Sequence, residues 1–182
     1  MNYVEPIRDK TIIEGMANYL KKENERNYVM FMTGMYSALR ISDILKLKIS
    51  DVANKDSINL REKKTGKQRI IKINPILKKI FKSYCQNKNY NEFLIYNPNN
   101  KLKPISRVMA WKILKRAGKL FGVENIGTHT MRKTFAFHYY MKTKNIGLLQ
   151  KIFNHNSPLV TLTYIGIEQN MINEALENFR IF

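Results

Sequence analysis

The apolar residues of this chain follow two spacings, and one of the two is confined to a short stretch. Between Asp9 and about Leu20, the side chains of Ile12, Ile13 and Met16 share one face of a helix with Leu20. Most of the remaining sequence repeats this helical spacing. In one stretch only, short segments rich in β-branched residues replace it. The sequence therefore predicts an α+β domain that is mainly α-helical, with a small antiparallel β-sheet.

The two β-branched segments are separated by a positively charged turn. Residues 57–60 and 69–73 have the length and composition of strands. Between them, residues 63–67 read Lys-Lys-Thr-Gly-Lys, and the glycine favours a turn. We therefore expect a β-hairpin with a basic tip.

Capping residues mark several expected helix ends. Asn74 precedes Pro75, which suits the first position of a helix. Ser42, Ser106 and Ser157 can each cap a following helix. The expected helices span about residues 9–20, 27–38, a short segment after Ser42, 74–88, 106–122, 129–142, 146–153, 157–164 and 168–179, and residues 97–100 form a loop.

The charge of the chain points to a polyanionic partner. The 182 residues include 32 Lys and Arg against 14 Asp and Glu, which gives a net charge of +18. Such self-repulsion destabilises a compact fold unless a polyanion neutralises it, and nucleic acid is the commonest such partner. An anionic membrane surface, a basic ribosomal protein and a well-solvated surface are the alternatives.

The positive charge is concentrated in two segments. Residues 61–82 hold nine basic residues against one acid, Glu62, and residues 101–119 hold seven basic residues and no acid. A basic hairpin and a basic helix suit phosphate contacts along double-stranded DNA, although solvated faces have the same composition. The candidate DNA-binding residues are Lys63, Arg69, Lys103, Arg107, Lys112, Lys115, Arg116 and Lys133.

Several classes of site are excluded or disfavoured. Cys85 is the only cysteine, so no internal disulfide can form, and its apolar neighbours favour a packing role. No Cys/His or His/carboxylate cluster has the spacing of a metal site, so we expect no metal. No apolar run is long enough to span a membrane and no signal peptide is evident, so we expect a cytoplasmic, DNA-associated protein.

Five short segments carry the residues on which a function can be argued. They are residues 39–43 (Leu-Arg-Ile-Ser-Asp), 63–67, 129–132 (His-Thr-Met-Arg), 154–155 (Asn-His) and 163–164 (Thr-Tyr). With their flanking residues, these segments resemble the tyrosine recombinase or phage integrase family, whose pattern is Arg, hairpin Lys, His-x-x-Arg, His or Trp, then Tyr. The resemblance covers about residues 8–180 and extends to bacterial Xer-like recombinases and to phage and transposon integrases. The matching residues are Arg40, Lys64, His129, Arg132, His155 and Tyr164.

The resemblance implies the tyrosine recombinase catalytic-domain fold and an attack by Tyr164 on a DNA phosphate. Arg40 and Arg132 would hold the non-bridging oxygens with bidentate guanidinium groups. His155 would donate a further hydrogen bond, and His129 would assist proton transfer from the phenol. The product would be a 3′-phosphotyrosyl link, which stores the bond energy, so that neither ATP, a metal nor another cofactor is required.

Two roles stay open within this pattern. Lys64 is the candidate general acid for the leaving 5′ oxygen, and Lys67 is the second candidate because it lies in the same turn. Asp43 follows Arg40 by three residues and could orient the arginine or a histidine. A first-turn carboxylate that interacts with a helix end is an equal interpretation of Asp43.

The resemblance also sets expectations for domains and assembly. Residues 1–182 would form one catalytic domain, and the usual N-terminal core-binding domain would be missing, either because the protein is minimal or because the chain is a fragment. The helix at 168–179 would dock on a neighbouring protomer or fold back on its own core. We expect a multimer, a tetramer on two synapsed DNA sites, and a monomer when DNA is absent.

Three functions are compatible with the sequence. The first is a site-specific recombinase or integrase. The second is single-site strand cleavage like that of a type IB topoisomerase. The third is a DNA-binding regulator that no longer cuts. The size of the chain and its motif segments favour the first function, and the six intact motif positions argue against the third.

Overall fold

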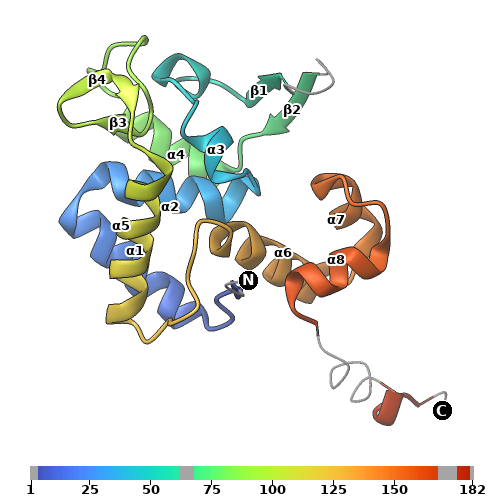
Figure 1. Cartoon of the computed structure of the whole chain (residues 1–182). Coiled ribbons are helices and arrows are strands. Elements are labelled where there is room, and N and C mark those ends of the chain that lie inside the picture. Colours follow the sequence, from blue (N-terminus) through green and yellow to red (C-terminus); the bar gives the residue numbers. More distant parts are fainter. Residues whose placement is uncertain (1–3, 62–67, 168–175, 181–182) are drawn as a thin grey trace.

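A helix at the centre of the domain organises the larger part of the fold. The computed structural model describes residues 4–61, 68–167 and 176–180. Helix α2 (Glu25–Ser37) contacts α1 (Lys10–Glu23), α3 (Ile41–Ile44), α4 (Pro75–Tyr84) and α6 (Thr130–Thr143), while α5 (Arg107–Leu120) packs on α1 (Figure 1). The main hydrophobic cluster lies between these helices, with Val29, Met30 and Phe31 of α2 completely buried.

The predicted hairpin is present, and a second hairpin accompanies it. Strands β1 (Ser57–Arg61) and β2 (Gln68–Lys72) pair antiparallel, with Ile58 opposite Ile71. Strands β3 (Tyr96–Asn97) and β4 (Asn100–Pro104) form a separate two-stranded sheet. The expectation of a single sheet was therefore wrong, and the loop expected at residues 97–100 is narrower, a turn at 98–99 that joins the two strands. Strand β3 has only two residues and the sequence around Pro98 is polar, so no strand pattern is visible there.

Helix ends follow the predicted capping residues. The side chain of Asn74 accepts a hydrogen bond from the Ile76 amide at 2.8 Å, and Pro75 occupies the first turn of α4. Ser106 caps α5 and Ser157 caps α8 (Pro158–Ile165) in the same way. These ends form where expected because a side-chain oxygen satisfies amides that have no partner within the helix.

Two expected helix ends are wrong. Ser42 lies inside α3, and Arg40 occupies the N-cap position without a side-chain hydrogen bond. Helix α4 ends at Tyr84 instead of continuing to about residue 88. Beyond this end, Asn87 adopts a left-handed backbone conformation, with φ of 60°, so the chain does not continue as a helix. Cys85 is half-buried beside the main cluster, in agreement with a packing role.

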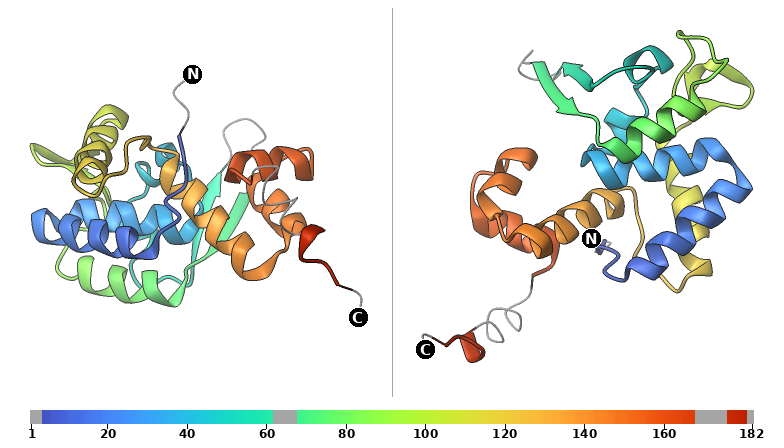
Figure 2. Two further views of the ribbon diagram at one scale, coloured as in Figure 1. Left: turned by 90° about the horizontal axis from the view of Figure 1, so that it is seen from below. Right: turned by 180° about the vertical axis from the view of Figure 1, so that it is seen from behind.

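A smaller hydrophobic cluster holds the C-terminal helices. Helices α7 (Ile146–Phe153) and α8 pack against each other and against α6, on the side away from α1 and α5 (Figures 1 and 2). The buried members of this second cluster are Ala38, Ala136, Leu149, Phe153 and Ile165. The domain is thus two packed bodies that share α6 and the end of α2.

The predicted last helix lies mostly outside the described residues. Only its final part, at 176–180, is described, and there Leu176 and Phe179 are exposed. Within the described ranges, no helix is both long and apolar enough to cross a bilayer. The fold class predicted from the sequence, mainly α-helical with small antiparallel sheets, is confirmed.

Candidate active site

Helix ends bring five of the six motif residues into one region. Arg40 precedes the first residue of α3, while His129 and Arg132 lie at the N-terminal end of α6. Asn154 ends α7 in a left-handed conformation, with φ of 56°, and His155 follows it. Tyr164 lies in the last turn of α8. Segments separated by more than a hundred residues therefore meet where the two hydrophobic clusters join.

Arg132 is the most buried of these residues, at 3 % exposure. Its Nη1 donates a hydrogen bond to the carbonyl of Ala38, which ends α2 in a left-handed conformation with φ of 57°. The guanidinium lies 4.3 Å from the centre of the Phe153 ring. Burial lowers the pKa of Arg132 to about 10, with Tyr164 opposing this shift and Arg40 and Arg69 adding to it. The group therefore stays charged at neutral pH.

Arg40 is exposed and supplies a second positive charge to the same region. Its charge lowers the pKa values of Arg132, His129, His155 and Tyr164, which requires it to lie close to all of them. Two guanidinium groups near one another, one held rigidly and one open to solvent, are suited to bind a phosphate.

Tyr164 lies in an aromatic cluster beside the arginines. Its ring is 5.2 Å from the His155 ring in an edge-on arrangement and 5.4 Å from the Phe153 ring. Its hydroxyl is buried and has no well-formed hydrogen bond to any part of the chain that the structure describes. Burial raises the pKa of Tyr164, while the charges of Arg132 and Arg40 lower it. The phenol is therefore protonated at neutral pH.

His155 is oriented by Thr161, a contact that sequence reasoning missed. Its Nδ1 lies 3.0 Å from the Thr161 hydroxyl, which is itself 3.3 Å from the Ser157 carbonyl. This contact occupies Nδ1 and leaves Nε2 without a hydrogen bond to the described residues. Burial lowers the pKa of His155, and Arg132 and Arg40 lower it further. No pattern in the sequence marks Thr161, because the contact depends on how α7 and α8 pack.

His129 occupies the N-cap position of α6 without a side-chain capping bond. It is exposed, yet desolvation by the surrounding protein lowers its pKa, and Arg132, Arg40, Arg107 and Lys133 lower it further. The imidazole is therefore neutral at neutral pH and can accept a proton. The effect of Arg107 also indicates that the start of α5 lies near this histidine.

The hairpin that carries Lys64 is tied to the site by Arg69. Lys63, Lys64 and Lys67 lie outside the described residues. Arg69, on β2, is half-buried, and its Nη2 donates to the carbonyl of Ile152 at 2.5 Å. This bond joins the hairpin to the last turn of α7, immediately before Phe153 and His155. The DNA contact expected for Arg69 stays a prediction.

Asp43 and Lys133 differ in how they relate to the site. Asp43 is half-buried in the first turn of α3, with Lys46 4.0 Å away, and among the described residues no hydrogen bond joins its side chain to Arg40 or a histidine. Lys133 lies with its Nζ 5.2 Å from the centre of the Tyr164 ring. Burial lowers the pKa of Lys133, and Glu5 opposes this shift. Lys133 thus belongs to the immediate surroundings of Tyr164.

The other candidate DNA-binding residues lie on β4 and α5. All are exposed, which leaves their side chains accessible to a ligand. Arg116 forms an ion pair with Glu23 at 3.0 Å, and Lys115 lies 4.9 Å from the centre of the Trp111 ring. The exposed residues of this group are Lys103, Arg107, Lys112, Lys115 and Arg116.

Comparison with known proteins identifies the family. The sequence profile of the phage integrase family matches residues 8–171. The chain belongs to the phage integrase family. This result confirms the resemblance drawn from the six motif residues and makes the chain a member of the tyrosine recombinases.

Relatives of different length support the same assignment. The chain is 45% identical to the probable integrase/recombinase YoeC of Bacillus subtilis, over 98% of both sequences. It is 26% identical to the tyrosine recombinase XerA of Pyrococcus horikoshii, over 87% of this chain and 56% of that protein. The chain therefore spans nearly the full length of the first relative and little more than half of the second.

Solved structures confirm the fold. A crystal structure of XerA recombinase aligns with a TM-score of 0.76 and 21% identity, over 98% of this chain and 67% of that one. The catalytic domain of bacteriophage HP1 integrase aligns with a TM-score of 0.63 and 17% identity, over 98% of this chain and 97% of that one. The expected catalytic-domain fold is therefore present.

Proposed function

We propose that this chain is a site-specific recombinase or integrase that cleaves and rejoins DNA with Tyr164 as the nucleophile. The observation that carries the proposal is the Tyr164 hydroxyl, which is buried without a well-formed hydrogen bond to the described residues and lies beside Arg132 and His155. Arg132 lies near enough for its charge and hydrogen bonding to lower the pKa of Tyr164, but the contact lacks the geometry of a well-formed hydrogen bond. A buried hydroxyl without a well-formed hydrogen bond is unfavourable unless a ligand supplies one. A phosphate held by Arg40 and Arg132 would supply it.

The arginines and His155 account for the stabilisation of the transition state. When the Tyr164 oxygen attacks phosphorus, negative charge grows on the two non-bridging oxygens. The guanidinium groups of Arg40 and Arg132 are the donors for these oxygens, and Nε2 of His155 is a third donor once it carries a proton. Preorganised donors of this kind contribute about 3 kcal/mol each.

Proton movements complete the reaction. The phenol has a raised pKa, so its proton must leave during the attack, and neutral His129 is the acceptor. The new bond joins phosphorus to the Tyr164 oxygen, and the bond to the 5′ oxygen breaks. Lys64, or Lys67 from the same turn, protonates that oxygen. Rejoining reverses these steps without ATP, because the phosphotyrosyl link conserves the bond energy.

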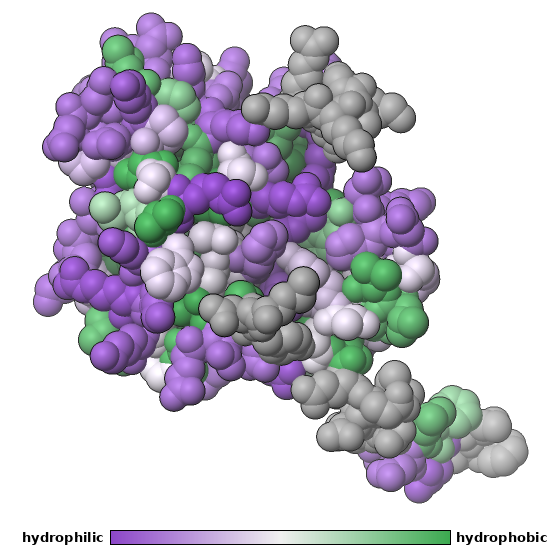
Figure 3. Space-filling view, viewed as in Figure 1, coloured by the Kyte–Doolittle hydropathy of each residue, from purple (hydrophilic) through white to green (hydrophobic). Residues whose placement is uncertain are grey.

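The basic residues of β4 and α5 are proposed to bind the DNA backbone. Lys103, Lys112 and Lys115 are exposed, and Arg107 lies near His129. The face of the molecule drawn in Figure 3 is largely hydrophilic, with an apolar patch at the side of α7 and α8. Recombinases of the same fold have been solved with DNA, such as XerH bound to its difH substrate. Backbone contacts of this type position a duplex without reading its sequence.

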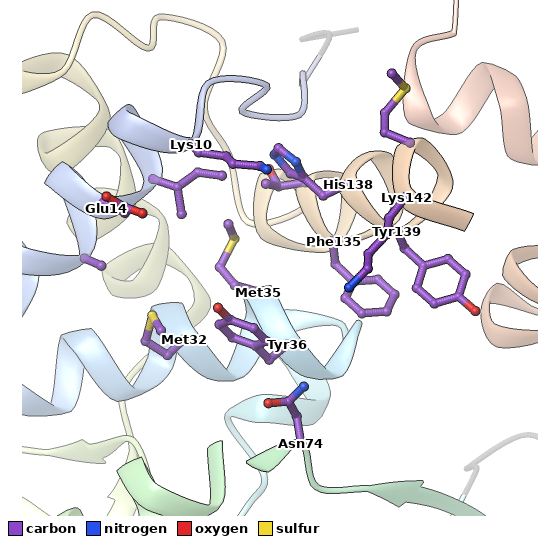
Figure 4. A pocket seen from close by; sticks show the side chains of 14 residues that line it. Lys10, Glu14, Met32, Met35, Tyr36, Asn74, Phe135, His138, Tyr139 and Lys142 are labelled. Atoms are coloured by element: carbon purple, nitrogen blue, oxygen red, sulfur yellow. The ribbon is translucent and has the colours of Figure 1, made fainter. Parts of the chain in front are cut away.

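Recombination between two sites requires several protomers, and we propose a tetramer. An apolar pocket of about 860 Å³ lies between α1, α2 and α6, lined by Met32, Met35, Tyr36 and Phe135 (Figure 4). Leu176 and Phe179 near the C-terminus are 70% and 66% exposed, so this segment has apolar side chains available for such a pocket on a second copy. Two lysines, Lys10 and Lys142, line the pocket against one acid, Glu14, so its charge favours the carboxylate of Glu177.

The tetramer has its own test. Light scattering of the protein with a DNA duplex that carries two sites is expected to detect four protomers. Replacing both Leu176 and Phe179 with Glu is expected to leave monomers on DNA, while the control Arg180→Glu keeps the assembly. Tetramers formed equally well by the double variant would exclude this role for the C-terminal segment.

The domain assignment is also a proposal. We propose that residues 1–182 act as one catalytic domain, because the region matched by the family, residues 8–171, contains all six motif residues. The XerA protein of Pyrococcus horikoshii is matched over 56% of its length, so the match does not extend to the whole of that protein. We propose that this chain also selects its DNA site and recombines two such sites.

The decisive experiment uses a nicked suicide substrate, which traps the covalent intermediate. The wild-type protein is expected to form a protein–DNA adduct that survives denaturing electrophoresis. Tyr164→Phe is expected to abolish the adduct and keep DNA affinity. An adduct formed by the Phe variant would exclude Tyr164 as the nucleophile. Exchange of strands between two sites, as opposed to relaxation of supercoils alone, separates a recombinase from a topoisomerase-like enzyme.

A further inference from the structure

The segment before α1 is fixed to α6 by two directional bonds. The amide of Ile7 donates to the Thr134 hydroxyl at 2.9 Å, and Nε2 of His138 lies 3.0 Å from the Ile7 carbonyl, where the ring N–H donates. Ile7 is buried at 3 % exposure. This segment lies beside α6 in the views of Figures 1 and 2. Arg8, the next residue, therefore starts from a well-defined position.

Arg8 bonds to the end of the helix that carries Tyr164. Its Nη2 donates to the carbonyl of Gly166 at 3.0 Å, and its guanidinium lies 5.5 Å from the centre of the Phe137 ring. Gly166 is the C-cap of α8, where φ of 69° favours glycine. Carbonyls at a helix C-terminus lack partners within the helix and carry partial negative charge, so a guanidinium is a suitable ligand there.

Apart from the contact between Thr161 and Nδ1 of His155, the remainder of α8 is held mainly by apolar packing. Ile165 is completely buried in the second cluster, while Leu159 and Val160 at the other end are 72% and 50% exposed. Apolar contacts are non-directional and permit small rotations of a short helix. The bond from Arg8 reaches Gly166, two residues after Tyr164 in sequence, and is a directional contact at this end of the helix.

We propose that Arg8 is a positioning residue for Tyr164, acting through the Gly166 carbonyl to hold the phenol in line with the bound phosphate. The inference rests on the function proposed above, because it assigns Arg8 to the cleavage step. Arg8 does not touch the reacting atoms. Its loss is expected to displace the Tyr164 ring relative to Arg132 and His155, and small displacements of a reacting group slow a reaction markedly.

Cleavage kinetics test the proposal. With a suicide substrate at saturating concentration, Arg8→Ala is expected to form adduct about tenfold more slowly than the wild type. The control Lys22→Ala removes one positive charge from the exposed end of α1 and keeps the wild-type rate. Both variants are expected to bind DNA with Kd values within about twofold of each other. Arg8→Lys is expected to recover part of the rate, because an ammonium can also donate to the Gly166 carbonyl.

A spectroscopic measurement separates positioning from activity. With 3-fluorotyrosine at position 164, the wild-type protein is expected to give one fluorine resonance, and Arg8→Ala a shifted or additional one. Equal spectra, or equal cleavage rates for Arg8→Ala and Lys22→Ala, overturn the proposal. If the wild type forms no adduct at all, the proposed function fails, and the fluorine spectra still decide whether Arg8 positions Tyr164.

Discussion

The guanidinium of Arg132 rests on the face of the Phe153 ring, 4.3 Å from its centre. Within the described residues no carboxylate forms an ion pair with this buried arginine. An aromatic face stabilises a desolvated cation by about 2 kcal/mol without neutralising it. The positive charge of Arg132 thus stays available for an anionic ligand, and its pKa of about 10 keeps it protonated.

Replacing Phe153 tests this relationship. Phe153→Leu is expected to slow adduct formation about tenfold, because a loss near 1.4 kcal/mol of support for Arg132 corresponds to that factor. Single-turnover cleavage at saturating DNA measures the effect. The control Phe81→Leu is also buried but lies in the main cluster. Both variants are expected to lower the free energy of unfolding by ~1–2 kcal/mol, but Phe81→Leu leaves the rate of adduct formation unchanged. Equal rates for the two variants would contradict the assignment.

The bond between His155 and Thr161 leads to a second prediction. Thr161→Val keeps the shape of the side chain and removes the hydroxyl that orients Nδ1 of His155. Adduct formation is expected to fall about tenfold, since a loosely held donor loses its preorganisation. Thr163→Val is the matched control, because that hydroxyl is exposed and, among the described residues, bonds to the Leu159 carbonyl of its own helix at 3.0 Å. A wild-type rate for Thr161→Val would remove Thr161 from the mechanism.

The lowered pKa of His129 predicts the acid side of the pH profile. In the free protein, desolvation and the surrounding cations hold this pKa below the usual value of 6.5, so the proton-accepting neutral form persists as the pH falls through that value. The apparent second-order cleavage rate reports on the free protein and is expected to decline only at lower pH. A 5′-bridging phosphorothiolate substrate removes the need for a general acid and isolates this limb. A midpoint at or above the usual histidine value would contradict the role of His129.

The general acid is the subject of the fourth prediction. Lys64→Ala is expected to slow cleavage of ordinary DNA strongly, because the 5′ oxygen leaves poorly without a proton. A 5′-bridging phosphorothiolate leaves readily unprotonated, so this substrate is expected to restore the rate of the variant. Lys67→Ala serves as the comparison from the same turn. Rescue of Lys67→Ala but not of Lys64→Ala would transfer the role to Lys67.

Local chemistry explains which parts of the fold were predictable. Asn74 with Pro75, Ser106, and Ser157 with Pro158 act on the backbone next to them, so the sequence alone locates those helix starts. The early end of α4 and the β3–β4 hairpin depend on more distant contacts. The Tyr84 hydroxyl, for example, donates to the Leu94 carbonyl at 3.0 Å and draws the following loop back onto the helix. No local pattern encodes such a contact.

The candidate site divides in the same way. The six motif residues were recognisable because their types and order follow a family pattern, and the structure describes five of them in one region. Phe153 follows the apolar spacing of α7, which predicts only that it is buried. Arg69 belongs to a basic segment, which favours a DNA contact, yet its guanidinium reaches the Ile152 carbonyl. These contacts join separate segments, so they became evident only in three dimensions.

The turn at Ala38 has a consequence for how the two arginines are placed. Its carbonyl holds Arg132, and Arg40 follows it by two residues in the chain. One short stretch of main chain therefore accepts the hydrogen bond from Arg132 and also carries Arg40. Helix α8, which carries Tyr164, lies outside this stretch of main chain, so the turn at Ala38 places the two arginines without involving the helix of the nucleophile.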